Sequence, residues 1–209
     1  MNTREIVVVK LGGSLLDLRE LPERLAAALA WLFPRRHLVI VGGGGAADVI
    51  RRLDHVHQWT KDASHALAIR SLDLTASILA SLVTGSIVVE DRAGCLAAWE
   101  SGRLPILAPR RLLETEDRGA DALPSSWDVT TDSIAARVAR ILGARTLLLL
   151  KSVDPPRDRK MQSLVDSGFV DAFFPIAAES LASVWTINLR DDRSQPHPIA
   201  VEAGDERGL

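Results

Sequence analysis

Near its beginning, the chain passes from an apolar segment directly into a Gly-Gly-Ser turn. Residues 6–11 comprise an isoleucine, three valines, a lysine and a leucine, which is typical of a strand buried in a sheet. The lysine, Lys10, is the last residue but one, so its amine can reach past the edge of the sheet. We expect a helix over 15–33, whose positive N-terminal end would face the bare amides of the turn. The segment therefore predicts a phosphate-binding turn between a strand and a helix.

The rest of the chain alternates strands with helices. We expect further strands at 38–41, 86–89, 104–107, 146–150 and 184–189, with a short edge strand at 197–201. The expected helices cover 46–53, 62–83 (with Asp62 as N-cap), 93–100, 132–142 and 177–183, and the expected loops are 54–60, 113–128 and 151–160. This alternation favours an α/β fold, a three-layer αβα sandwich around a mainly parallel central sheet.

The composition narrows the class of protein. With 209 residues and a net charge of −2, the chain suits one globular domain and shows no excess of basic charge for nucleic acid or membrane. The longest clear apolar run, 25–33, is far shorter than the roughly 20 residues that span a bilayer, and we expect no signal segment before the first strand. The single cysteine, Cys95, permits no internal disulfide. We therefore expect a cytoplasmic protein with neither a nucleic-acid nor a membrane partner.

Residues suited to phosphate chemistry follow several of the expected strands. Parallel strands bind ligands at their carboxyl ends, so the turn at 12–14, the glycines at 42–45 and Lys151 should meet at one edge of the sheet. Asp132 begins the helix that leads into the strand before Lys151. Lysines, bare amides and a carboxylate suit phosphoryl transfer, in which the protein positions two groups and neutralises charge. The simpler interpretations are a solvated Lys10 and an Asp132 that acts only as a helix N-cap.

Four consecutive glycines and one charged pair call for an explanation. Each glycine at 42–45 costs roughly 0.5–1 kcal/mol relative to alanine inside an element, so we expect the backbone there to approach a ligand closely. Arg70 and Asp73 lie three residues apart in the helix expected over 62–83, hence on one face. They either form a surface ion pair or clamp a substrate, Arg70 binding a phosphate and Asp73 an amine.

Other motifs are absent or weak. The chain lacks the Gly-x-x-x-x-Gly-Lys-Ser/Thr motif of P-loop NTPases. The run at 42–47 fits a permissive dinucleotide-binding pattern, but no acidic residue closes a second strand about 20 residues later, which disfavours a dehydrogenase. His55, His57 and His65 have no cysteine or other ligand at a recognised spacing, so we expect no metal site among them.

Four motifs together resemble the amino acid kinase family, which includes acetylglutamate, aspartate, uridylate and isopentenyl phosphate kinases. They are Val-Lys-Leu-Gly-Gly-Ser at 9–14, Val-Gly-Gly-Gly-Gly at 41–45, Thr-Thr-Asp-Ser-Ile-Ala-Ala at 130–136 and the strand and loop at 147–154. The resemblance implies an ATP-dependent kinase with a three-layer αβα fold that forms a homodimer or higher homo-oligomer. Within a single domain, 1–209, Mg-ATP would bind over about 126–209 and a small-molecule acceptor over about 1–125.

The resemblance also implies roles for residues at matching positions. Lys10 would stabilise the transferring phosphoryl group, and the catalytic set would be Lys10, Asp132 and Lys151. The residues implied to bind the nucleotide are Gly12, Gly13, Ser14, Asp154 and Lys160. The residues implied to bind the acceptor are Gly42, Gly43, Gly44, Arg70, Asp73 and Trp127. Either Lys151 or Lys160 would be the second cationic clamp on the nucleotide phosphates.

Two departures and one likeness refine this expectation. The family's Thr-Asp-Val-Asp-Gly loop is replaced by Lys-Ser-Val-Asp-Pro-Pro at 151–156. Isopentenyl phosphate kinases carry a histidine soon after the glycine run, where this chain has Ala-Ala-Asp at 46–48, which argues against that acceptor. The short chain, the segment 65–73 and Trp127 resemble the kinases of methanofuran biosynthesis. That likeness implies phosphorylation of an aminomethyl-furan methyl phosphate to its diphosphate, with Trp127 stacking on the furan. The alternatives are another acceptor, such as an amino acid derivative or uridylate, and a non-catalytic nucleotide-binding protein used in sensing or storage.

Overall fold

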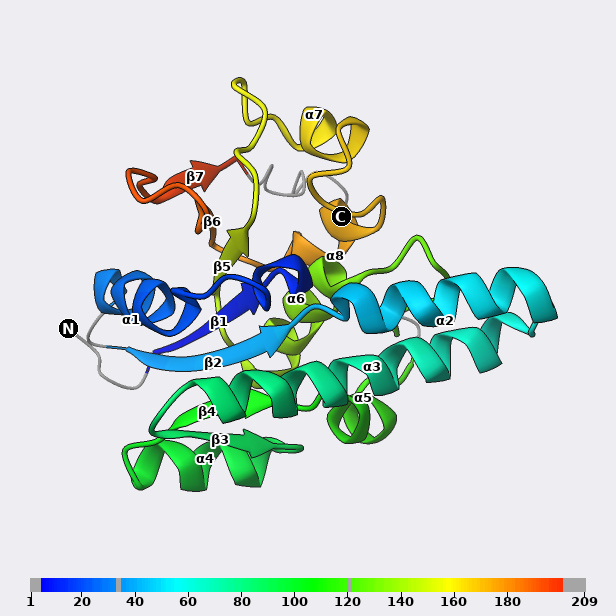
Figure 1. Ribbon diagram of the computed structural model, residues 1–209, viewed down its shortest axis with the longest axis horizontal. Helices are drawn as coiled ribbons and strands as arrows, with labels where there is room; N and C mark the ends of the chain where they lie inside the picture. The colour runs from blue at the N-terminus through cyan, green and yellow to red at the C-terminus, as the bar shows by residue number, and fades with distance from the viewer. Residues whose placement is uncertain (1–4, 33–34, 120–121, 201–209) are drawn as a thin grey trace, which may run out of the picture.

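A seven-stranded sheet forms the centre of the molecule (Figure 1). The computed structural model describes residues 5–32, 35–119 and 122–200. The strands are β1 (Ile6–Leu11), β2 (Arg36–Val41), β3 (Ser86–Val89), β4 (Leu104–Leu107), β5 (Thr146–Lys151), β6 (Ser183–Asn188) and β7 (His197–Ile199). They are ordered β3-β4-β2-β1-β5-β6-β7, and every neighbouring pair is parallel except β6 with β7. The expected α/β fold with a mainly parallel sheet is confirmed.

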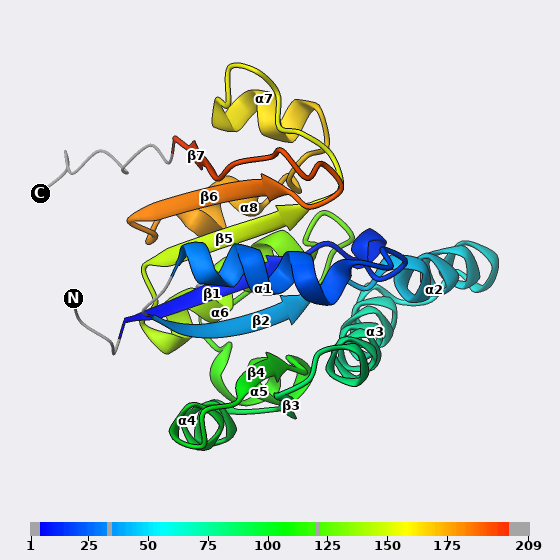
Figure 2. The same cartoon turned by 60° about the vertical axis from the view of Figure 1, so that its left-hand side comes forward.

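Helices cover both faces of this sheet (Figure 2). They are α1 (Leu21–Trp31), α2 (Gly44–His57), α3 (Lys61–Leu82), α4 (Arg92–Glu100), α5 (Arg110–Glu116), α6 (Thr131–Leu142), α7 (Met161–Asp166) and α8 (Phe174–Ala178). The long helices α2 and α3 pack side by side and extend beyond the carboxyl ends of the strands (Figure 1). Among the described residues, no helix is both long enough and apolar enough to cross a membrane.

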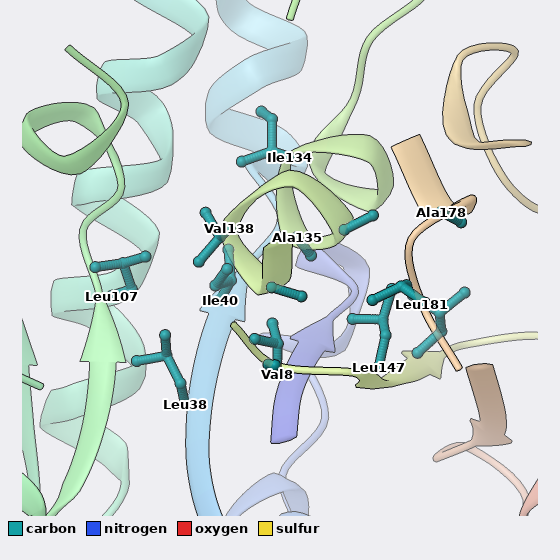
Figure 3. Packing of buried hydrophobic residues seen from close by; sticks show 14 of the residues in the cluster. Val8, Leu38, Ile40, Leu107, Ile134, Ala135, Val138, Leu147, Ala178 and Leu181 are labelled. Carbon is teal, nitrogen blue, oxygen red and sulfur yellow. The ribbon is translucent and has the colours of Figure 1, made fainter. Parts of the chain in front are cut away.

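Two apolar cores lie on opposite faces of the sheet, because successive strand residues point to opposite faces. On one face, α6 packs on β1 and β5, where Ala135 lies among Val8 and Leu147 (Figure 3). On the other face, α1 covers the sheet through residues such as Leu25, which belongs to the same core as Val9. The same alternation directs the residue after Val9, Lys10, toward α6.

The first turn does not open onto a helix as expected. The residues that follow β1 form a short 3₁₀ turn at Gly13–Leu15, and α1 begins only at Leu21, with Pro22 in its first turn. Proline suits this position because its missing N–H is not needed there. The helix expected over 15–33 is therefore shorter, and its last residue, Phe33, lies outside the described residues. The prediction that the helix following the Gly-Gly-Ser turn presents its N-terminus to that turn is therefore wrong.

Several other boundaries differ from those expected. The helix α2 continues to His57, through part of the segment expected as the loop 54–60, and ends where Gln58 adopts a left-handed conformation. The N-cap of α3 is Thr60, whose side chain accepts from the Ala63 N–H, and not Asp62. The helices α5 and α7 were not expected from the sequence. The helix α8 begins at Phe174, before the helix expected over 177–183.

Candidate active site

Lys10, Asp132 and Lys151 meet at the carboxyl edge of the central strands. β1 and β5 are parallel neighbours, and their alternation points both lysines toward the first turn of α6, which carries Asp132. Lys10 Nζ lies 2.9 Å from Asp132 Oδ1, and Lys151 Nζ lies 2.8 Å from Oδ2. Lys151 Nζ also donates to the Phe169 carbonyl at 2.5 Å. Each carboxylate oxygen is therefore matched with one ammonium, and two positive charges share one negative charge.

This cluster is almost entirely removed from water. Lys10, Asp132 and Lys151 expose 7%, 4% and 9% of their surfaces, so the interpretation of Lys10 as a solvated strand-end lysine is wrong. Burial alone would raise the pKa of Asp132, but the two ammonium groups outweigh it and hold that pKa below its usual value. Burial and then the like charge of Lys10 lower the pKa of Lys151 to about 8. An anion placed beside the cluster would complete its charge balance.

Asp171 holds the start of α6 in place. Its Oδ2 accepts from the backbone N–H groups of Thr130 and Ser133, each at 3.1 Å, and from the Thr130 hydroxyl at 2.8 Å. The Ser133 hydroxyl donates to Oδ1. Thr130, and not Asp132, is the N-cap of α6, so the interpretation of Asp132 as a cap is wrong. Sequence reasoning missed Asp171, because nothing in its local pattern marks a partner that lies about 40 residues away.

The two glycine turns pack directly against each other. A Cβ on Gly13 would lie 2.3 Å from Gly44 N and 2.5 Å from Gly42 O, so neither turn tolerates a side chain there. Gly44 also has a φ of +49°, in the left-handed region that favours glycine. At Gly45 a Cβ would meet nothing within 4 Å. Contact between the two backbones thus explains Gly42 and Gly44 without a ligand, and the expected close approach of a ligand to 42–45 stays a prediction.

A pocket of about 310 Å³ opens beside the second glycine turn. It lies between α2, α3 and the segment leading into α6. Its volume is within the usual range for small-molecule sites. Its lining includes Gly43 and the polar or aromatic residues Arg51, Asp54, Trp59, Lys61, Ser64, His65, Trp127, Asp128 and Thr131. Of the residues expected to bind an acceptor, Gly43 and Trp127 line this pocket. Thr131 connects it to the charged cluster, because Asp132 is the next residue.

Comparison with known proteins identifies the family. The family model described as the amino acid kinase family matches residues 5–155. The chain belongs to the amino acid kinase family. The [5-(aminomethyl)furan-3-yl]methyl phosphate kinase of Methanocaldococcus jannaschii is 29% identical over 181 residues, which are 81% of this chain and 81% of that protein. The expected phosphotransferase class is thus confirmed.

Solved structures share the fold of this kinase. Uridylate kinase from Archaeoglobus fulgidus has a TM-score of 0.60 and 19% identity, covering 86% of this chain and 89% of that chain. UMP kinase from Ureaplasma parvum has a TM-score of 0.59 and 15% identity, covering 91% of this chain and 92% of that chain. At these identities the likeness concerns the fold alone.

The kinase ties its first turn to the loops after β5 and β6. Ser14 Oγ donates to Ser152 Oγ at 3.0 Å, and Arg190 donates to the Ser14 carbonyl at 2.7 Å. The Gly12 N–H donates to the Leu150 carbonyl at 2.8 Å and so continues the pairing of β1 with β5. The expectation that the Gly12 amide contacts a phosphate is therefore wrong.

Asp154 and Lys160, the two residues expected to bind the nucleotide in the loop after β5, have partners or positions outside the buried cluster. Asp154 accepts from the Asn188 side-chain amide at 3.1 Å, which joins the loop to the end of β6. Lys160 is exposed at the start of α7, where it is the N-cap residue. Between the two lysines considered as the second clamp, Lys151 is the one that lies beside Lys10.

Arg70 and Asp73 do not act together as expected. Asp73 binds Arg110 through both the backbone N–H, at 3.3 Å, and Nε, at 3.2 Å. Burial raises the pKa of Asp73 in spite of these bonds. Arg70 is exposed, and neither residue lines the 310 Å³ pocket. The prediction that Arg70 and Asp73 clamp an acceptor is therefore wrong for this pocket. The alternative, a surface ion pair between the two, is wrong as well, because Asp73 pairs with Arg110.

The histidines take separate positions. His55 and His57 lie in the last turn of α2, where His57 stacks on Trp59 with ring centroids 5.7 Å apart. His65 lines the pocket, and burial lowers its pKa. Across 5–32, 35–119 and 122–200, no three side chains of histidine, cysteine, aspartate or glutamate are grouped to hold a metal ion.

Proposed function

We propose that this kinase transfers the γ-phosphoryl group of Mg-ATP to the phosphate of a small acceptor that also carries an aromatic ring and an amine. The favoured acceptor is an aminomethyl-furan methyl phosphate, the substrate named for the Methanocaldococcus jannaschii relative. The observation that carries this proposal is the pocket with aromatic and carboxylate walls directly beside the buried cluster. In the reaction, an acceptor phosphate oxygen bonds to the γ-phosphorus, the bond from that phosphorus to the bridging oxygen breaks, and ADP leaves.

Lys10 and Lys151 neutralise the transferring group in this proposal. Their cluster keeps one net positive charge out of water, where electrostatic stabilisation is stronger than at a solvated surface. Asp132 orients both ammonium groups. The nucleotide would lie over the half at 126–209, where Asp154 and Lys160 in the loop after β5 would bind it. Gly13 and Ser14 would bind it from the neighbouring first turn. Gly42, Gly43 and Gly44 would border the acceptor half at 1–125.

The cluster fits magnesium only as part of the nucleotide complex. Both oxygens of Asp132 already face an ammonium group, so this carboxylate is not a free ligand. A Mg²⁺ ion held by the phosphates would neutralise charge on their oxygens. The residues of the chain would then bind and orient the nucleotide around it.

Release of ADP with Mg-ATP and a panel of acceptors tests the proposal. The panel holds aminomethyl-furan methyl phosphate, acetylglutamate, aspartate, uridylate and isopentenyl phosphate. We expect turnover with the first, and a more than tenfold lower rate in Lys10→Ala, because that change removes charge stabilisation in the transition state. Turnover of a different acceptor would overturn the substrate, and ATP binding with no turnover at all would favour the non-catalytic alternative.

A further inference from the structure

Asp54 is the carboxylate that the pocket holds most firmly. It lies on α2, with Oδ1 accepting from the Ser64 hydroxyl at 2.5 Å and Oδ2 accepting from the Trp127 indole N–H at 2.9 Å. These bonds, the one from Ser64 first, lower the pKa of Asp54, so it is ionised at neutral pH. We propose that Asp54 recognises the amine of the acceptor and thereby selects amine-bearing substrates, an inference that rests on the proposed function.

The position of the reacting phosphate fixes the direction of the acceptor. The phosphate must lie at the end of the pocket near the charged cluster, where Thr131 precedes Asp132 and Gly43 follows β2. Gly43 is the N-cap of α2 and Asp54 its eleventh residue, so the two are ~16 Å apart along the helix at ~1.5 Å per residue. The far end of the acceptor therefore lies toward Asp54.

The length of the acceptor matches this distance. With ordinary bond lengths, phosphorus and the amine nitrogen of an extended aminomethyl-furan methyl phosphate are ~8 Å apart. A hydrogen bond at each end adds ~3 Å, and side chains on a helix lean toward its N-terminus, which brings the Asp54 carboxylate closer to Gly43. An amine at the far end of the acceptor thus reaches Asp54.

The charges around the far end favour an amine there. The Arg51 guanidinium binds Asp48 at 2.9 Å and lies over the Trp127 ring, 4.8 Å from its centroid, so its charge is already partnered. His65 is uncharged at neutral pH because burial lowers its pKa. Lys61 is the other cationic residue of the lining, which also contains two carboxylates, Asp54 and Asp128.

Asp54 has capacity for one more donor, whereas Asp128 is less constrained. A carboxylate offers about four lone-pair positions, and on Asp54 three of them accept from Ser64, Trp127 and the Trp59 backbone N–H. Asp128 is exposed, and its Oδ2 accepts from the hydroxyl of Ser126, two residues earlier, at 2.8 Å. A rigid, half-buried carboxylate discriminates charge better than a mobile exposed one, because less rotational freedom is lost on binding.

Two acceptors and three variants test the inference. The acceptors are aminomethyl-furan methyl phosphate and the analogue in which a hydroxyl replaces the amine. We expect wild type to prefer the amine by roughly 10- to 100-fold in kcat/KM, as for hydrogen bonds between charged groups. Asp54→Asn, which keeps the shape of the side chain, should bring the ratio near one, while the matched Asp128→Asn should retain it.

The outcomes separate this inference from the proposed function. Wild type that turns over both acceptors equally, or an Asp54→Asn protein that keeps the preference, overturns the role of Asp54 and leaves the kinase assignment standing. Turnover of neither acceptor overturns the proposed function itself. Asp54→Glu keeps the charge, so it should retain part of the preference that Asp54→Asn loses. If Asp54 is only structural, the Glu and Asn variants should show the same ratio.

Discussion

Replacing Lys151 by methionine tests whether its ammonium acts on the transferring phosphoryl group or only stabilises the fold. The ammonium is buried and shares Asp132 with Lys10, so it is the second positive charge on a single carboxylate. A phosphoryl oxygen ~5 Å from it gains about 3 kcal/mol at an effective dielectric constant of ~20. Loss of that gain corresponds to a fall of roughly 100-fold in kcat/KM.

Stability should respond much less than activity. Burial lowers the pKa of Lys151 to about 8, so keeping the charged ammonium in the fold is unfavourable, and methionine has a similar length without the charge. Asp132 still has Lys10 at 2.9 Å after the change and is not left as an unpaired buried charge. The free energy of unfolding should therefore change by less than about 1 kcal/mol.

Initial rates of ADP release and urea unfolding measure the two quantities in the same protein. The matched control is Arg145→Met, which removes an exposed positive charge just before β5, at the other end of that strand, and should leave both near wild type. An unchanged kcat/KM in Lys151→Met would refute a role on the phosphoryl group. A loss of stability of about 3 kcal/mol or more would instead assign the ammonium to the fold.

The charge, backbone and hydrogen-bond contacts of the site each carry a further prediction. Because the pKa of Lys151 is lowered to about 8, raising the pH through that value removes its charge, and ATP should then bind more weakly and with uptake of protons. Calorimetry in two buffers of different ionisation enthalpy measures this uptake, and a release of protons would contradict the prediction. Gly13→Ala should cost more than about 3 kcal/mol in urea unfolding, since its Cβ would lie 2.3 Å from Gly44 N, whereas Gly45→Ala, with open space, should be neutral or stabilising; similar costs for both would contradict the packing argument. Asp171→Ala should lower Tm by ~5–10 °C and kcat/KM by more than tenfold, because the first turn of α6 loses its acceptor; an unchanged kcat/KM would show that Asp132 holds its place without it.

The elements that are buried on well-defined faces could be predicted closely from the sequence. The strand expected at 6–11 is β1, and the helix expected over 132–142 is α6, which begins one residue earlier. Both carry regular apolar patterns, because one face or both faces contact the core along most of their length. The rule that ligands bind at the carboxyl ends of parallel strands then indicated one edge, and Lys10, Asp132 and Lys151 do meet there.

Contacts between distant segments could not be predicted in this way. The helical spacing of Arg70 and Asp73 fixes their common face but not what lies opposite, and Asp73 in fact pairs with Arg110 of α5. Gly42 and Gly44 contact the first turn, and the local glycine pattern contains no sign of that contact. Asp54 lay in an expected loop, so its place in the wall of a pocket was also hidden.

The segment between Lys151 and Asp171 links the loop expected to bind the nucleotide to the buried cluster. It begins at Lys151 itself, passes through the loop expected to bind the nucleotide and through α7, and returns at Phe169, whose carbonyl accepts from the Lys151 ammonium. Two residues later, Asp171 fixes the turn of α6 that carries Asp132. Both acceptors of the Lys151 ammonium are therefore held by this one returning segment. A nucleotide bound to this loop, as proposed, would contact the same segment. A shift of the segment would then change the surroundings of the Lys151 ammonium directly, without passing through the sheet.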